Sequence, residues 1–328
     1  MATSLNYFAV TFRGLEDLLA EELRELPSVS ITQVQYRRVH FRAQYDPQLT
    51  ALTCCDDLFL ELAQWSGITR DRANISRMQG LLSNINLTDA IGHIRQYRPI
   101  PNDYTISVTV NHVGKRNYTS AEIKASAGLH LAPRYVENDS LADINLRIFI
   151  EGDAASVGLR LTAQPLYQRS YTTNSSGSPA KLKPPVAAAM LRMAKVSDAF
   201  VDPFCGNGTL LSEGKIHGLN GFGGDIIKSL TGLPVAQWDA RMLPLATSTV
   251  DRIVSNLPWD IQIPIKAGAE DFYASVSREL ERVLHPTGKM VLLTTTPEML
   301  QFNQLRGEVA NIEISLFGQR PRIVQYEH

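Results

Sequence analysis

The sequence is short of cysteine and of long apolar stretches. Only three of its 328 residues are cysteines, two of them adjacent (Cys54 and Cys55) and the third, Cys205, in a glycine-rich turn. This spacing supplies neither a disulfide framework nor a zinc-ligand set, so we expect no metal site. No apolar run approaches the roughly 20 residues that span a bilayer, and the first residues do not read as a secretion signal. These absences argue against a membrane protein and make the cytoplasm the expected location.

Net charge of either sign is also missing. The chain has 32 Lys+Arg against 33 Asp+Glu; residues 1–180 hold 17 basic and 18 acidic residues, and residues 181–328 hold 15 of each. Many nucleic-acid-binding proteins carry a basic excess. Any RNA-binding surface must therefore be a local patch, and the charge balance alone favours an enzyme acting on a small molecule.

The first half of the chain has the pattern of two small α+β units. In the first, apolar periodicity predicts strands at 7–12 and 34–41 and helices at 15–26 and 48–65. In the second it predicts helices at 88–97, with Thr88 as a cap, and 120–131, a strand at 104–110, and a hairpin of residues 144–151 and 155–161 that turns at Gly152-Asp153. Residues 172–185 are rich in Ser, Gly and Pro, which is typical of a linker.

Beyond the linker, short apolar strands alternate with helices. This alternation is typical of a parallel α/β sheet. The expected strands are 199–203, 221–225, 235–239, 250–256, 289–295, 311–317 and 322–326. We expect the last two to form an antiparallel pair at one edge of the sheet.

The strongest local signal is the sequence DPFCGNGT at residues 202–209. It forms a glycine turn between an apolar strand and a helix that starts near Thr209. At the carboxyl end of the first strand, Gly206 and Gly208 allow the backbone to approach a ligand without a Cβ in the way. No GKS or GKT follows, which excludes a P-loop.

Polar residues also end the next three strands, at Asp225, Asp239 and Asn256. A carboxylate after the second strand can accept hydrogen bonds from ribose hydroxyls, and one after the third could accept from an adenine amine. Either aspartate alone could equally be a solvated strand end or a helix cap. All three together predict a nucleoside site at this edge of the sheet.

The fourth strand runs into NLPW, residues 256–259. The side-chain carbonyl of Asn256 can accept from an amine, the carbonyl of Pro258 is a second acceptor, and Trp259 offers a ring on which a purine can stack. As an isolated tetrapeptide this would more often be a turn with a buried aromatic. Its position after the fourth strand favours a base-amine site.

The DPFCGNGT turn together with NLPW resembles the N2-guanosine RNA methyltransferases. The preceding chain is similar to the THUMP-containing branch that acts on tRNA, because ASVGLRL (155–161) and PLYQRSY (165–171) resemble the end of a THUMP domain and its exit. The resemblance implies an α/β fold in which a Rossmann-like methyltransferase domain (186–328) follows a ferredoxin-like domain (1–66), a THUMP RNA-binding domain (67–171) and the linker (172–185).

The resemblance also implies the ligands and the roles of the residues. S-adenosyl-L-methionine would bind at Asp202, Pro203, Cys205, Gly206, Gly208, Thr209, Asp225, Asp239 and Ala240. The target base would be held by Asn256, Pro258 and Trp259, with direct methyl transfer to guanine N2 and no covalent intermediate on Cys205. The substrate would be tRNA, with the acceptor stem as the candidate region. A small activator protein is a candidate partner, and we expect a monomer.

One departure leaves alternatives open. Only about eight residues separate Asp225 from the next strand, where a crossover usually needs a dozen or more, so a helix is expected to be missing. An inactive or partner-dependent RNA-binding paralogue is therefore a second interpretation. A methyltransferase acting on adenine N6 or on a ribosomal guanosine is a third.

Basic residues that could contact RNA lie in the second unit, at its exit and in the linker. Any one of them could be an ordinary solvated charge. The candidates are Lys115, Arg116, Arg134, Arg169, Lys181 and Lys183.

Overall fold

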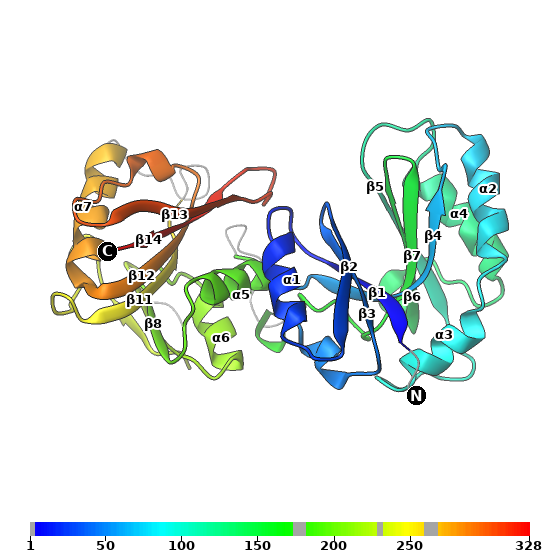
Figure 1. Cartoon of the computed structure of the whole chain (residues 1–328), viewed down its shortest axis with the longest axis horizontal. Helices are drawn as coiled ribbons and strands as arrows, with labels where there is room; N and C mark the ends of the chain where they lie inside the picture. Colours follow the sequence, from blue (N-terminus) through cyan, green and yellow to red (C-terminus); the bar gives the residue numbers. More distant parts are fainter. Residues whose placement is uncertain (1–3, 173–181, 228–231, 259–267) are drawn as a thin grey trace. The chain divides into compact units, whose positions relative to one another are not determined.

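The computed structural model describes residues 4–172, 182–227, 232–258 and 268–328. The described chain forms two seven-stranded sheets (Figure 1). Its internal contacts divide it into two compact units, residues 1–10 with 22–166 and residues 11–21 with 167–328. Each unit contains one of the sheets.

The first sheet runs through both of the domains predicted for the N-terminal half. Its strand order is β2-β3-β1-β4-β7-β6-β5. The strands are β1 (Leu5–Val10), β2 (Val29–Gln35), β3 (Arg38–Ala43), β4 (Asp57–Ser66), β5 (Ile106–His112), β6 (Ile144–Glu151) and β7 (Ala154–Arg160). Strand β4 pairs antiparallel with both β1 and β7. The boundary expected at residue 66 therefore coincides with the end of β4, inside one continuous sheet.

Two of the α-helices of this part begin at a residue whose side chain caps them. They are α1 (Glu16–Arg24), α2 (Ala73–Leu82), α3 (Leu87–Ile94) and α4 (Ser120–Leu131), with 3-10 turns η1 (Pro47–Ala51) and η2 (Asp139–Leu141). Thr119 and Glu122 form a reciprocal capping box at α4. Helix α3 is capped by Asn86, whose side chain accepts from the backbone of Thr88 and Asp89, and not by Thr88 as predicted. Helix α4 packs on β5, with α2 against α4.

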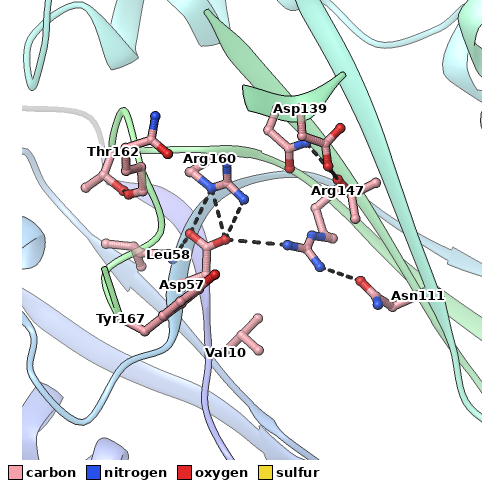
Figure 2. A network of polar contacts seen from close by, with 12 residues as sticks. Val10, Asp57, Leu58, Asn111, Asp139, Arg147, Arg160, Thr162 and Tyr167 are labelled. Carbon is pink, nitrogen blue, oxygen red and sulfur yellow. Dashed lines mark hydrogen bonds and ion pairs between the residues drawn. The ribbon is translucent and has the colours of Figure 1, made fainter. Parts of the chain in front are cut away.

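A buried ion network crosses the junction between β4 and β7 (Figure 2). Asp57 of β4 accepts from Nε of Arg160 on β7 at 2.9 Å, and Nη2 of Arg147 on β6 lies 3.5 Å from the same carboxylate. Arg147 also donates to Asn111 of β5, and both guanidinium groups lie over the ring of Phe59. The network joins four strands, which come from both predicted N-terminal domains. Removing one partner would leave a buried charge uncompensated, so the intact network holds these strands together.

The second sheet has the order β10-β9-β8-β11-β12-β14-β13. Its strands are β8 (Ala199–Asp202), β9 (Asn220–Asp225), β10 (Val235–Gln237), β11 (Val250–Asn256), β12 (Leu284–Thr294), β13 (Arg306–Glu313) and β14 (Arg322–Glu327). Neighbouring strands from β10 through β12 are parallel, and β14 is antiparallel to both β12 and β13. From β8 the chain goes first to one side and then, with β11, to the other. In α/β sheets the ligand crevice is expected at such a switch point, here at the carboxyl ends of these two strands.

Helices cover both faces of this sheet (Figure 1). They are α5 (Pro184–Met193), α6 (Thr209–Ile216) and α7 (Ala269–Val283), with 3-10 turns η3 (Ser170–Thr172) and η4 (Pro297–Met299). Phe200 packs against Gly214 of α6, and the next residue, Val201, packs on the core that contains Tyr273 and Val276 of α7. Successive strand residues point to opposite faces, so α6 and α7 lie on opposite sides of β8.

Both crossovers next to β10 are short. Residues 226–227 and 232–234, the described part of the β9–β10 connection, contain no helix, as the sequence predicts. Residues 238–249, between β10 and β11, also contain none. An apolar hollow of about 590 Å³ lies on the sheet here, lined by Val201, Phe222, Val235 and Leu245 among others. The second missing helix was not predicted.

Two predictions for the first unit are wrong. The strand expected at 34–41 is two strands, β2 and β3, separated by a turn in which Arg37 has a φ of 59°. The helix expected at 48–65 is η1 followed by β4. Leu58 and Leu60 of β4 are buried, and so is Phe59 between them, because this central strand is covered on both faces. Such a strand shows no alternation, and its leucines imitate helical spacing.

Candidate active site

The glycine turn follows β8 and leads directly into α6. Gly206 and Gly208 have φ values of 45° and 69°, in the left-handed region that favours glycine. Space around Gly206 is open, since a Cβ added there would meet no atom within 4 Å. Gly208 is the N-cap of α6, so the backbone N–H groups of Thr209 and the residues after it belong to the first turn of that helix. A ligand can thus approach the backbone at this turn.

Cys205 is held inside the same turn. Its backbone N–H donates to the carbonyl of Gly224 at 3.0 Å, and its carbonyl accepts from Gly208 at 2.7 Å. Burial raises the pKa of the Cys205 thiol to about 12. A thiol with this pKa is a poor nucleophile, which agrees with a structural role beside the site.

Asp202, at the end of β8, is fixed by a neighbour from β11. Its Oδ1 accepts from Oγ of Ser255 at 2.6 Å and from the backbone N–H of Phe204 at 3.2 Å. The side chain is buried, and burial raises its pKa to about 7. The Ser255 bond therefore joins the tips of the two strands that border the crevice.

Asp225, at the end of β9, contacts the glycine turn. Its Oδ2 accepts from the N–H of Gly206 and its Oδ1 from the N–H of Ile227, both at 3.1 Å. The structure thus brings together the strand tips that carry Gly206 and Asp225.

Asp239, just after β10, already has a cationic partner. Arg241 binds its carboxylate through Nη2 at 2.6 Å and through Nε at 3.0 Å, and these hydrogen bonds lower the pKa of Asp239. Ala240 beside it is buried. The Trp238 indole donates to the carbonyl of Pro203 at 3.0 Å, which links the tip of β10 to the glycine turn.

Asn256 ends β11 with a side-chain acceptor that has no partner among the described residues. Its Oδ1 is buried and accepts no hydrogen bond from any described residue. The next residue, Leu257, makes the last sheet-type bond, to the carbonyl of Leu293, and the carbonyl of Pro258 accepts from the hydroxyl of Tyr273 at 2.7 Å. Trp259 lies outside the described residues. A buried acceptor without a donor is costly to a fold, and it indicates a place for a ligand donor.

Sequence reasoning missed the residues that hold this arrangement. Ser255 was adjacent to a predicted site residue, but nothing marked its bond to Asp202. Tyr273 lies 15 positions beyond Pro258 on an amphipathic helix, where an aromatic residue indicates only packing.

Three of the basic residues predicted to contact RNA lie in the first compact unit, residues 1–10 and 22–166. They differ in exposure and in the hydrogen bonds that they already make. Lys115 is exposed. Arg134 is exposed too, lies over the Tyr104 ring and donates to the carbonyls of Asn102 and Tyr104. The guanidinium of Arg116 donates to backbone carbonyls, among them those of Ile68 at 2.9 Å and of Gly152 at 2.5 Å. The fold therefore uses donors of Arg116 that RNA would otherwise take.

The remaining basic candidates belong to the second unit. The side chain of Arg169 is 11% exposed and pairs with the fully buried Glu213 of α6 at 3.1 Å. Lys183 precedes α5 and its Nζ lies 5.4 Å from the ring centre of Phe317. Lys181 lies outside the described residues. Of these three, Arg169 has its charge compensated within the protein.

Sequence comparison shows which protein families the two parts of the chain resemble. Residues 169–225 and 230–314 match the model of the family described as RMKL-like, methyltransferase domain, and residues 6–52 match the RlmL ferredoxin-like domain. Most of the second compact unit is therefore similar to an RMKL-like methyltransferase domain. This confirms the predicted enzyme class and the ferredoxin-like start of the methyltransferase, whereas the THUMP domain over residues 67–171 stays a prediction.

Two sequence relatives and one solved structure resemble this chain. A tRNA (guanine(6)-N2)-methyltransferase from Thermus thermophilus is 28% identical over 313 residues, which cover 89% of this chain and 90% of that protein. A ribosomal RNA large subunit methyltransferase K/L from Photobacterium profundum is 30% identical over 221 residues, 63% of this chain but 28% of that protein. The crystal structure of TrmN from Thermus thermophilus has a TM-score of 0.76 at 24% identity and covers 98% of this chain and 99% of that one. The fold is therefore shared along the whole chain, and its Rossmann-like part is confirmed.

No described helix of the methyltransferase is both long and apolar enough to cross a membrane.

Proposed function

We propose that this methyltransferase transfers a methyl group from S-adenosylmethionine to the exocyclic N2 amine of a guanosine in tRNA. The observation that carries the proposal is the buried Oδ1 of Asn256 at the tip of β11, which accepts no hydrogen bond from the part of the chain that the structure describes. An exocyclic amine is a donor, and it would satisfy this acceptor.

The two acceptors suit the chemistry of an aromatic amine. The lone pair of such an amine is delocalised into the ring, so the amine is a weak nucleophile. Hydrogen bonds from its N–H groups to the Asn256 amide oxygen and the Pro258 carbonyl stabilise the positive charge that develops on nitrogen as the new bond forms. The same acceptors hold the lone pair in line with the incoming methyl group. We call Asn256 and Pro258 the base half of the crevice.

The other side of the crevice fits the methyl donor. When bound, S-adenosylmethionine supplies an electrophilic methyl group on a sulfonium. The open space at Gly206 and the backbone of the turn that includes Pro203, Gly208 and Thr209 can accept its methionine part next to Asp202. Asp225 would accept from the ribose hydroxyls and Asp239, beside Ala240, from the adenine amine. The glycine turn, Asp202, Asp225 and Asp239 are the cofactor half.

Transfer RNA is the favoured substrate because of the relative that matches nearly end to end, the tRNA (guanine(6)-N2)-methyltransferase at 90% coverage. The ribosomal RNA enzyme is matched over 28% of its length. Exposed Lys115 and Arg134 are the charges in the first unit that we propose for contact with phosphates. A cytoplasmic location, a monomeric state and an activator protein remain predictions.

The direct test is methylation by the purified full-length protein. It would be incubated with methyl-labelled S-adenosylmethionine and, separately, with unmodified transcripts of tRNA and of large-subunit ribosomal RNA, and the digested nucleosides would be separated by mass. We expect label in N2-methylguanosine from tRNA alone. Label in N6-methyladenosine, or in ribosomal RNA alone, would replace this substrate with another, and binding of tRNA without any transfer would indicate an RNA-binding paralogue.

A further inference from the structure

The first turn of α7 contacts both halves of the crevice. Phe272 packs with its ring centre 6.2 Å from that of Phe204 in the glycine turn. Tyr273, the next residue, donates from its hydroxyl to the carbonyl of Pro258 at 2.7 Å. The two rings stand edge to face, 5.5 Å apart. One short stretch of helix therefore touches the turn that would hold the methyl donor and the carbonyl that would hold the base.

Tyr273 is held in place by the core of the second sheet. It is 1% exposed and belongs to the same cluster as Val276 and Leu280 from the next turns of α7. A ring packed in this way cannot swing, so its hydroxyl has a fixed position. A buried phenol needs a hydrogen-bond partner, and here the partner is a strand-tip carbonyl of the site.

The position of this bond matters because the sheet no longer guides the chain at Pro258. The N–H of Leu257 still bonds to Leu293, but Pro258 has no N–H to donate. A carbonyl oxygen has two lone pairs. With one engaged by Tyr273, the carbonyl has a defined direction and retains a lone pair for the base amine.

We propose that Tyr273 is a positioning residue for methyl transfer: its hydroxyl orients the Pro258 carbonyl so that the second lone pair accepts from the guanine amine. This inference rests on the proposed function. In the step it serves, the amine lone pair forms the nitrogen–carbon bond, the electrons of the carbon–sulfur bond pass to sulfur, and the proton that the amine loses goes to water. Tyr273 does not touch the reacting atoms and gives up no proton.

The test compares two hydroxyl deletions in the same core. Tyr273→Phe removes the hydroxyl that donates to the Pro258 carbonyl and keeps the ring. Tyr326→Phe, the control, removes a hydroxyl from another largely buried ring of the same cluster, on β14. Full-length proteins would be assayed for kcat and for KM of S-adenosylmethionine and tRNA, with cofactor Kd by calorimetry and Tm by scanning calorimetry.

We expect Tyr273→Phe to lower kcat roughly 10- to 100-fold, as for a misplaced catalytic group. The KM values and cofactor Kd should stay within about twofold, and Tm should fall by no more than about 4 °C. Tyr326→Phe should leave kcat unchanged. The split between kcat and KM is the readout that a merely structural role would not produce.

With an active wild-type protein, three results overturn the inference while leaving the proposed function intact. They are an unchanged kcat in Tyr273→Phe, equal kcat losses in both variants, and a kcat loss in Tyr273→Phe accompanied by a matching loss of cofactor affinity. A wild-type protein that makes no N2-methylguanosine overturns the proposed function itself.

Discussion

The cofactor half and the base half of the crevice differ in how their polar atoms are satisfied. In the cofactor half every carboxylate has a donor from the chain itself: Asp202 has Ser255, Asp225 has the Gly206 N–H, and Asp239 has Arg241. In the base half, by contrast, Asn256 Oδ1 accepts from no described residue. The carboxylates of the cofactor half thus have hydrogen-bond donors without a ligand, whereas Asn256 of the base half has none among the described residues.

This difference predicts two kinds of effect for substitutions in the site. A ligand of the cofactor half replaces or shares existing hydrogen bonds, so substitutions there should change binding and stability. A ligand of the base half donates to an acceptor that no described residue satisfies. Substitutions there should therefore change turnover with little effect on the stability of the fold. The four predictions that follow test this separation.

The largest effect is expected from Asn256→Ala. Loss of one preorganised acceptor should lower kcat about 100- to 1000-fold, with cofactor Kd within about threefold. Because the substitution removes an unsatisfied buried group, Tm should stay level or rise. Steady-state kinetics and calorimetry measure both. Asn220→Ala, at the opposite end of this sheet, where the side chain donates to Asp198, is the matched control; retained turnover in Asn256→Ala would show that the amine acceptor lies elsewhere.

Asp225→Ala should act on binding. Hydrogen bonds to a charged group contribute about 1.5–3 kcal/mol, which corresponds to a cofactor Kd roughly 10- to 150-fold weaker. At saturating S-adenosylmethionine, kcat should approach the wild-type value. Isothermal titration gives Kd, and a kcat loss that saturation cannot restore would break the separation between the two halves.

Asp202 should make cofactor binding depend on pH. Its pKa is about 7 because of burial, and the ammonium of S-adenosylmethionine prefers the ionised carboxylate. Affinity should therefore tighten roughly 10-fold from pH 6 to pH 8. The folded-state pKa lies above the unfolded one, so the free energy of unfolding should fall, by up to about 4 kcal/mol, as pH rises from about 4 to about 7.

Asp202→Asn should flatten both pH profiles, whereas Asp198→Asn, at an exposed position before the same strand, should leave them intact. Titrations and thermal melts across this pH range are the measurements. A pH dependence that survives in Asp202→Asn would assign it to another group.

The smallest effect is expected from Arg241→Ala. This exposed partner competes for the Asp239 carboxylate, so its removal should tighten cofactor binding by roughly fivefold at most, with no measurable change in Tm. Competition binding resolves such a shift, with Arg252→Ala, an arginine on β11, as the control. Weaker binding in Arg241→Ala would mean that Arg241 itself contacts the cofactor.

Sequence patterns predicted the second unit better than the first. In the second unit, strands such as those ending at Asp202 and Asn256 are followed by turn residues that mark their ends. In the first unit, the β6–β7 hairpin was likewise predicted from its Gly152-Asp153 turn. The β4 segment failed because burial on both faces removes the alternation that marks a strand. At the site, residues at strand tips could be listed in advance, but the partners of those residues could not.

The sequence by itself determined the order along the chain of the strands in the second sheet, the glycine turn and the identity of the polar groups at the strand tips, because these depend on local periodicity and on residue chemistry. Only the tertiary structure decided that Ser255 binds Asp202, that Tyr273 binds Pro258 and that Asn256 is left with an open acceptor. Hydrogen bonds between residues far apart in the chain depend on how strands and helices pack, and no local pattern encodes that packing.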